Sequence, residues 1–349
     1  MDILMKEFMI TFKPKQVTKK LLSVLPDRAR DVLEKRYGLG ANSESQTLEA
    51  IGKIYGITRE RVRQIENYGI QSIQKSSVYR EFTHTFEELK SAIQQLGGVV
   101  NEKALFDELT KDSSLRNHLF FILMVGEPFR RIKEDSSFNY RWCLEQKLSG
   151  TVEKALKNIF DSLSEDDLIT EEEIIARLKH ELGEVEECYR DEAIFKRWLS
   201  ISKQIDKNPL GEWGHASSPN VRAKGIRDYA YLAVKRHGSP MHFKEVADSI
   251  KSLFEKKAHV ATTHNELIKD ERFVLVGRGL YALTEWGYSA GVVKDVLRDV
   301  LQTHGPLTRE EIIDKVRRER YVKDNTIIVN LQDTTLFKRL PDGNYILVA

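Results

Sequence analysis

The feature that most constrains the fold is the segment at residues 47–74, TLEAIGKIYGITRERVRQIENYGIQSIQ. Its first half carries three apolar residues at intervals of three and four: Leu48, Ile51 and Tyr55. At those intervals they share one face of a helix. Gly56 interrupts the pattern where a sharp turn needs positive φ, and Ile57 anchors the turn. Thr58 stands where its hydroxyl can cap a second helix, so the segment predicts two helices joined by a tight turn.

The second helix is predicted to turn a polar face outward. Its inward positions are Val62, Ile65 and Ile70. Its outward positions near the N-terminus are Arg59, Glu60, Arg61, Arg63 and Gln64. In a helix-turn-helix the first turns of the second helix contact base edges in the major groove, where Arg pairs with guanine, Gln with adenine and Glu with cytosine. The alternative is a surface helix whose charges only solvate it. The turn spacing and the side chains favour double-stranded DNA as the partner, with Thr58 among the contact residues.

The flanking sequence carries a family resemblance. LLSVLPDRARDVLEKRYGLG, followed by TLEAIGKIYGITRERVRQIE, resembles region 4 of bacterial primary sigma factors over residues 21–76. In that family the first part is a supporting helix pair and the second part reads the −35 promoter element. The resemblance implies three base readers: Arg59, Glu60 and Gln64. It implies nearby backbone or base contacts for Arg61 and Arg63, and RNA polymerase as a further partner.

The resemblance does not extend over the first 20 residues. They form a short Lys-rich leader, for which we predict a frayed helix or arm without a core. We therefore expect the sigma-factor regions that melt the −10 element and grip the core polymerase to be missing. The chain is not expected to be a complete sigma factor.

Downstream of residue 80 a common order of signals repeats about every 65 to 70 residues. Three predicted helices are followed by two strands around a polar turn, which is the winged-helix plan. The predicted units, after the leader at 1–20, are residues 21–77, 83–145, 151–217, 225–288 and 291–349. The predicted fold class is mainly α, a tandem array of helix-turn-helix and winged-helix units with small β-hairpin wings. The polar residues 214–224 are predicted to link two halves of the chain.

The unit at residues 225–288 carries a second resemblance. RDYAYLAVKRHGSPMHFKEVADSI, followed by HNELIKDERFVLVGRGLYALTEWGY, is similar to the HARE-HTH winged helix. That domain occurs in a polymerase delta subunit, restriction systems and chromatin proteins, so the resemblance implies nucleic-acid or polymerase association. A sigma-like reader joined to this domain also resembles uncharacterised bacterial transcriptional regulators.

Candidate contacts follow from the position of residues within the two C-terminal units. Thr262 and the next three residues are predicted to open the readout helix of unit 225–288, and Arg278 to occupy its wing tip. Helix N-termini and Gly-flanked Arg residues suit phosphate contact. The predicted DNA contacts are Thr263, His264, Asn265 and Arg278. The alternative makes His264 and Asn265 caps and Arg278 an ordinary turn residue. The last unit has a basic cluster at the end of its second helix, formed by Arg317, Arg318 and Arg320. These arginines either contact DNA or only solvate the helix and interact with its dipole.

Charge is unevenly distributed along the chain. Residues 1–80 hold 15 Lys and Arg against 9 Asp and Glu, residues 145–195 hold 6 against 15, and residues 222–349 hold 22 against 17. Basic ends around an acidic middle are typical of a protein whose ends approach phosphate while its centre does not. Like charges repel within a Debye length of about 8 Å, so we predict a spacer or protein-contact role for unit 151–217.

No catalytic, cofactor or metal site is predicted. The sequence lacks GxxxxGK[ST], GxSxG and paired-carboxylate motifs, and its nine histidines lack partners at ligand spacing. The two cysteines, Cys143 and Cys188, indicate free thiols in a reducing cytosol. The longest apolar run, residues 119–125, is too short to span a bilayer, and no signal pattern is present. We expect a cytoplasmic protein without membrane contact.

These patterns predict a sequence-specific, double-stranded DNA-binding transcription regulator that is not an enzyme. One alternative is an RNA polymerase-associated scaffold whose helix-turn-helix units have lost DNA contact. The other is a non-catalytic DNA-recognition component of a restriction or defence system. The oligomeric state and the sign of regulation do not follow from the sequence.

Overall fold

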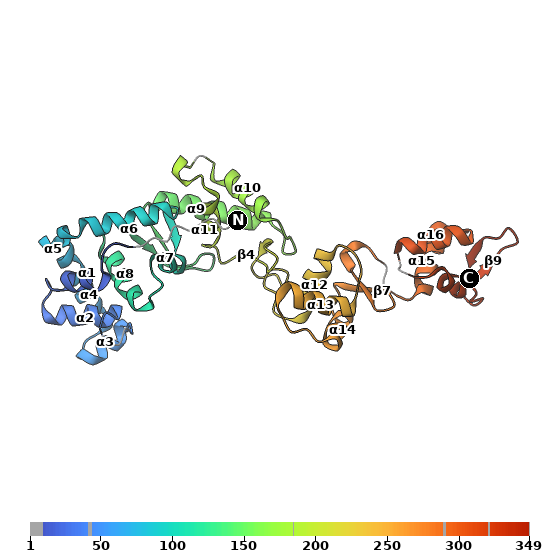
Figure 1. Ribbon diagram of the computed structural model, residues 1–349, viewed down its shortest axis with the longest axis horizontal. Coiled ribbons are helices and arrows are strands. Elements are labelled where there is room, and N and C mark those ends of the chain that lie inside the picture. The colour runs from blue at the N-terminus through green and yellow to red at the C-terminus, as the bar shows by residue number, and fades with distance from the viewer. Residues whose placement is uncertain (1–9, 41–43, 184, 289–290, 320–321, 349) are drawn as a thin grey trace. The chain divides into compact units, whose positions relative to one another are not determined.

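The computed structural model describes residues 10–40, 44–183, 185–288, 291–319 and 322–348 (Figure 1). The fold is mainly helical with small antiparallel sheets, which confirms the predicted fold class. Two compact units divide the chain. One is Met1–Asp206 with Trp213–Ala216, and the other is Lys207–Glu212 with Ser217–Ala349.

The predicted helix-turn-helix is formed by α3 (Leu48–Tyr55) and α4 (Arg59–Lys75), supported by α1 (Pro14–Leu22) and α2 (Asp27–Tyr37). Thr47 caps α3 by accepting a hydrogen bond from the backbone N–H of Ala50. Gly56 ends α3 at φ 64°, a conformation that glycine adopts without strain. The Thr58 hydroxyl accepts from the Arg61 N–H at 3.2 Å and so starts α4. The helix-turn-helix prediction is confirmed in these local details.

The prediction that residues 1–20 lack a core is wrong for its described second half. Helix α1 begins at Pro14, and Val17 and Leu21 are buried in the main apolar cluster of the first unit. These two side chains are four residues apart and lie on one helical face. Residues 1–9 lie outside the described part of the chain.

A winged-helix unit follows. Its helices are α6 (Thr83–Gln95), α7 (Glu102–Leu109) and α8 (Ser113–Val125), preceded by the short α5 (Ser77–Glu81). Its strands are β1 (Val99–Asn101), β2 (Arg130–Ile132) and β3 (Arg141–Cys143). They form an antiparallel sheet in the order β1-β3-β2. Only the β2–β3 pair was expected from the sequence, because β1 lies directly between the Gly97–Gly98 pair and the start of α7.

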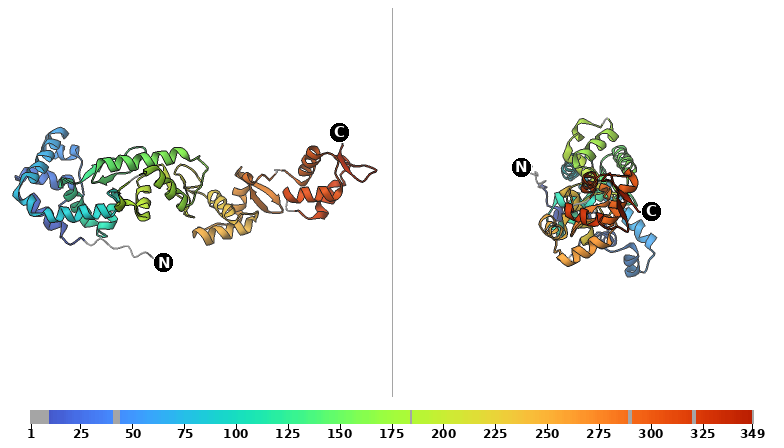
Figure 2. Two further views of the ribbon diagram at one scale, coloured as in Figure 1. Left: turned by 90° about the horizontal axis from the view of Figure 1, so that it is seen from above. Right: turned by 90° about the vertical axis from the view of Figure 1, so that its right-hand side faces the viewer.

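Helix α8 packs against α1, α2 and α4, so the first winged helix and the helix-turn-helix share one core (Figures 1 and 2). The Phe121 ring stands edge-on to Tyr37 with ring centroids 5.3 Å apart. Polar contacts close the same junction. Gln74 on α4 donates to the Val125 carbonyl at 2.9 Å, and Asn117 donates to the Gly38 carbonyl at 3.0 Å.

The acidic unit also has the winged-helix plan. Its helices are α9 (Gln146–Ser162), α10 (Glu171–Leu182) and α11 (Glu192–Leu199), with a 3-10 turn at Glu187–Tyr189. Its hairpin pairs β4 (Ile205–Lys207) with β5 (Trp213–His215). Helix α11 packs on β1 of the preceding unit, and Trp198 shares a core with Val99, Phe138 and Cys143.

The second compact unit contains two further winged helices. The third has α12 (Ile226–His237), α13 (Phe243–Phe254), α14 (Val260–Lys269), β6 (Met241–His242), β7 (Phe273–Gly277) and β8 (Leu280–Leu283). Its strands form a sheet in the order β6-β8-β7. The fourth has α15 (Val293–His304), α16 (Arg309–Glu319), α17 (Asp324–Leu331), β9 (Phe337–Arg339) and β10 (Tyr345–Leu347). The hairpins and helices predicted for both units are present.

The chain passes for the last time from the first compact unit to the second after Ala216, inside the polar joint predicted at residues 214–224. This joint is packed rather than a free linker. Ser218 and Asn220 are buried, and the Asn220 side-chain oxygen accepts from Arg272 at 3.1 Å. Because Arg272 also binds Asp228 and Asp270, the end of the joint is fixed to the third winged helix.

Candidate DNA-binding surface

The N-terminal half of α4 is exposed, as predicted. The exposed side chains are Thr58, Arg59, Glu60, Arg61, Arg63 and Gln64. The opposite face of α4 is anchored by Val62, which forms a small core with Val32 and Ile51. A Cβ at Gly52 would lie 2.6 Å from the Ile57 carbonyl oxygen, so the close approach of α3 to the turn requires glycine. This packing fixes the direction of the polar face.

The C-terminal half of α4 differs from the predicted pattern. Ile70, expected to point inward, is only half-buried, whereas Ile73 is fully buried in the core shared with α8. Gly69 allows α4 to approach α2, because a Cβ there would lie 2.9 Å from a methyl carbon of Leu33. The inward face therefore turns toward the first winged helix, which the helix-turn-helix pattern alone could not indicate.

Two i,i+3 pairs organise the exposed face of α4. Arg63 donates to both carboxylate oxygens of Glu60, at 2.6 and 2.9 Å. This hydrogen bonding lowers the pKa of Glu60 and raises the pKa of Arg63. Arg61 donates to the side-chain oxygen of Gln64 at 3.0 Å. The Arg59 side chain makes no hydrogen bond or ion pair to the described residues, so its guanidinium is ready to bind another group.

In the third unit the predicted contacts separate into buried and exposed groups. Thr263 is fully buried, and its hydroxyl donates to the His259 carbonyl at 3.1 Å. Its prediction as a DNA contact is at odds with the structure, because its only polar side-chain atom is turned inward. Helix α14 begins at Val260, earlier than expected, and Thr263 shares its inner face with Leu267, four residues later.

The other three predicted contacts of this unit remain accessible. His264 is half-buried and stacks on Phe243, with ring centroids 4.3 Å apart. Asn265 is exposed on α14, and neither residue caps the helix. Arg278 is exposed in the turn between β7 and β8, where Gly279 has φ 73°. Exposed Lys256 and Lys257 precede α14 and were not among the predicted contacts, because they lie outside both the helix and the wing.

In the fourth unit the predicted basic cluster is already occupied by carboxylates. Arg317 lies 2.7 Å from Asp324, and Arg318 lies 2.9 Å from Asp314. Arg320 lies outside the described residues. The two described arginines therefore have intramolecular partners, which weakens their case as phosphate contacts.

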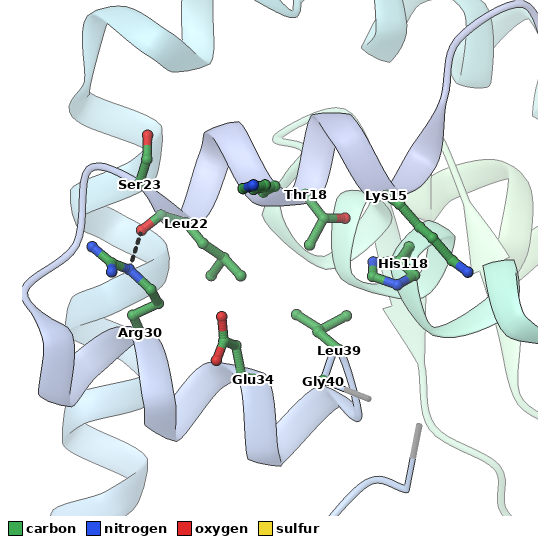
Figure 3. A pocket seen from close by; sticks show the side chains of 10 residues that line it. Lys15, Thr18, Leu22, Ser23, Arg30, Glu34, Leu39, Gly40 and His118 are labelled. Atoms are coloured by element: carbon green, nitrogen blue, oxygen red, sulfur yellow. Dashed lines mark hydrogen bonds between the residues drawn. The ribbon is translucent and has the colours of Figure 1, made fainter. Parts of the chain in front are cut away.

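A surface pocket of about 620 Å³ lies beside α1, α2 and α8 (Figure 3). Arg30 donates to the carbonyl oxygens of Leu22 and Leu25 at 3.3 and 2.9 Å. Partial burial lowers the pKa of His118, and the nearby Lys15 charge lowers it further. The two hydrogen bonds from Arg30 tie α2 to the C-terminal end of α1.

The described part of the chain contains no cluster of three or more His, Cys, Asp or Glu side chains arranged to hold a metal ion. Within the same residues, no helix combines the length and apolarity needed to cross a membrane. Cys143 is buried, Cys188 is exposed, and both are free thiols.

Comparison with known proteins identifies the first part of this surface. Residues 21–75 match the family model for sigma-70, region 4. The chain carries a sigma-70 region 4 domain. A 66-residue segment is 44% identical to RNA polymerase sigma factor SigA of Nostoc sp. (strain PCC 7120 / SAG 25.82 / UTEX 2576). That match covers 18% of this chain and 17% of SigA.

Region 4 is a DNA-binding, non-catalytic domain, and the exposed face of α4 lies within it. The predicted sigma-like helix-turn-helix is therefore confirmed. The match ends at residue 75, and the resemblance of residues 225–288 to the HARE-HTH domain stays a prediction.

Proposed function

We propose that this chain is a sequence-specific, double-stranded DNA-binding transcription regulator in which α4 reads a promoter element. The observation that carries the proposal is the exposed Arg59–Gln64 face on a firmly packed helix of a region 4 domain. The Arg59 guanidinium suits guanine, the Gln64 amide suits adenine, and ionised Glu60 accepts from cytosine. Arg61 and Arg63 exchange their intramolecular acceptors for DNA backbone or base groups when the helix enters the groove.

The two middle winged helices serve as a spacer in this proposal. Readout by a winged helix requires its third helix to face the groove. Helix α8 is packed against α1, α2 and α4, and α11 is packed on β1. Helix α10 also opens with three glutamates, which oppose phosphate approach.

The third unit adds contacts that position the protein without selecting bases. Arg278 at the wing tip binds phosphate or enters the minor groove, and Asn265 and the accessible edge of His264 approach the duplex from α14. Lys256 and Lys257, exposed just before α14, add positive charge to the same unit. Support comes from their exposure and from the excess of positive charge in residues 222–349.

RNA polymerase is the proposed protein partner, since the SigA relative is by name an RNA polymerase sigma factor. The inner faces of α1 and α2 are covered by α8. A polymerase contact would therefore use the remaining exposed surface of the region 4 domain.

The proposal is tested by selecting bound sequences from a pool of random duplexes with the full chain. A preferred motif that depends on Arg59 and Gln64 supports it, whereas uniform recovery of all sequences contradicts it. Affinity purification with and without nuclease separates the other functions. Polymerase retained after nuclease treatment, together with no sequence preference, would favour the polymerase-associated scaffold. A preferred motif that is absent from the host genome, together with no co-purified polymerase, would favour the defence role.

A further inference from the structure

The fourth winged helix has an exposed third helix with an unusual set of side chains. Helix α17 turns Ile327 and Leu331 into the core of its unit. Its outward positions are Asn325, Thr326 and Val329. Val329 is 64% exposed, a large fraction for an apolar side chain in a folded unit. The outward face is uncharged.

The carboxylates at the two ends of α17 are neutralised by neighbouring helices. Asp324, the first residue of α17, has both oxygens within 2.8 Å of Arg317 on α16. Asp333, just beyond the helix, pairs with Lys294 on α15, and hydrogen bonds from Lys294 and Thr335 lower its pKa to about 2. Because these charges are compensated within the unit, they do not oppose the approach of phosphate as free carboxylates would.

Exposed cations lie before and after α17 in the chain. Lys323 precedes α17 and is exposed, and the wing strand β9 carries exposed Lys338 and Arg339. The guanidinium of Arg339 lies 5.9 Å from the ring centroid of Tyr345 across the hairpin. An uncharged helix face suits base edges, and exposed cations in the same unit suit the phosphates beside them.

We propose that α17 is a second base-reading helix and that it recognises an A·T-containing step of duplex DNA. Asn325 donates to and accepts from adenine through its amide, and the methyl groups of Val329 and Thr326 contact a thymine methyl. Lys323, Lys338 and Arg339 bind the flanking phosphates. The inference rests on the proposed DNA-binding function and assigns the fourth unit a reading role distinct from the positioning role of Arg278.

The test is selection from random duplexes with full-length protein and four variants. Wild type is expected to enrich two separate sequence blocks. The double variant Asn325→Ala, Val329→Ala should lose the A·T-containing block and bind a duplex carrying both blocks roughly 5- to 150-fold more weakly. Asn325→Gln should keep the block, because glutamine can also pair with adenine. Gln302→Ala, an exposed change on α15, is the matched control.

The outcomes separate this inference from the function of α4. Replacing Arg59 and Gln64 with alanine should abolish the other block and leave the α17 block in place. If wild type enriches a single block and the Asn325, Val329 double variant still enriches it, the inference is overturned. The α17 face is then assigned to a protein partner. If wild type enriches only the α17 block, the inference stands and α4 is not the reader. If it enriches neither block, both proposals fail. Thermal unfolding of each variant confirms that these exposed changes leave the fold intact.

Discussion

The indole Nε1 of Trp198 donates a 3.1 Å hydrogen bond to the carbonyl oxygen of Gly97, which lies 101 residues earlier in the chain. The contact joins α11 of the acidic unit to the segment just before β1. Gly97 has φ 113°, and a Cβ there would lie 2.8 Å from Ile194 and 3.0 Å from the indole nitrogen. Glycine is therefore required at this junction. Helix α11, the third helix of the acidic unit, is packed against the preceding unit at this junction. It is therefore not available to enter a DNA groove.

Changing Trp198 to phenylalanine should destabilise the first compact unit without altering DNA preference. The buried Gly97 carbonyl would lose its donor, which costs about 1–3 kcal/mol of unfolding free energy. Urea denaturation of the full chain, followed by helix content, measures the effect. His180→Ala is the control, because the His180 side chain is 87% exposed on the same unit. Equal stability of the two variants would show that the junction is not closed in solution.

The region 4 domain should not fold as an isolated piece. A fragment of residues 21–76 lacks most of α1 and all of α8, both of which supply its core. It would expose the apolar faces around Leu33, Tyr37 and Ile73 to water. We expect poor amide dispersion in NMR spectra and no cooperative thermal unfolding. A well-folded fragment would contradict the shared core.

The helix-turn-helix could be predicted from local sequence signals, whereas its packing against the first winged helix could not. Gly56 and Thr58 act within one turn, so the residue types alone predict the conformation. The junction with α8 depends on contacts between residues as far apart as Gln74 and Val125. One signal was available, since residues 119–125 form an apolar run too uniform for a one-sided surface helix. Such a helix is buried on most sides.

The differences between expectation and structure at the predicted contact sites have a similar origin. Residues four apart on a helix share a face, and Thr263 lies four residues before the buried Leu267. Helix α14 begins at Val260 rather than Thr262, and Thr263 lies within the helix on its inner face. The ion pair between Arg317 and Asp324 could not be predicted from the sequence either, because it forms only when α16 and α17 pack together.

Replacing Arg59 or Gln64 with alanine should weaken binding to the preferred duplex by roughly 1–3 kcal/mol and relax the preference at one or two positions. The loss arises because each side chain pairs with a particular base edge, so random duplexes should be affected much less. Competition binding on preferred and scrambled duplexes measures the difference. Lys75→Ala, at the far end of the same helix, is the matched control. An equal loss on both duplexes would assign Arg59 and Gln64 to phosphate contact.

Arg278 is expected to contribute affinity and salt dependence but no sequence preference. Each phosphate contact contributes about 0.9 to the slope of log affinity against log salt, so losing one should lower the slope by about 1. Arg278→Glu should therefore bind more weakly with a shallower slope, while the preferred sequence stays unchanged. Lys154→Glu makes the same charge change at an exposed position on α9 of the acidic unit, and its slope should match wild type. A salt titration of the three full-length proteins on one duplex measures these slopes. If all three coincide, the β7–β8 wing does not touch DNA, and Arg278 is free for a contact with polymerase.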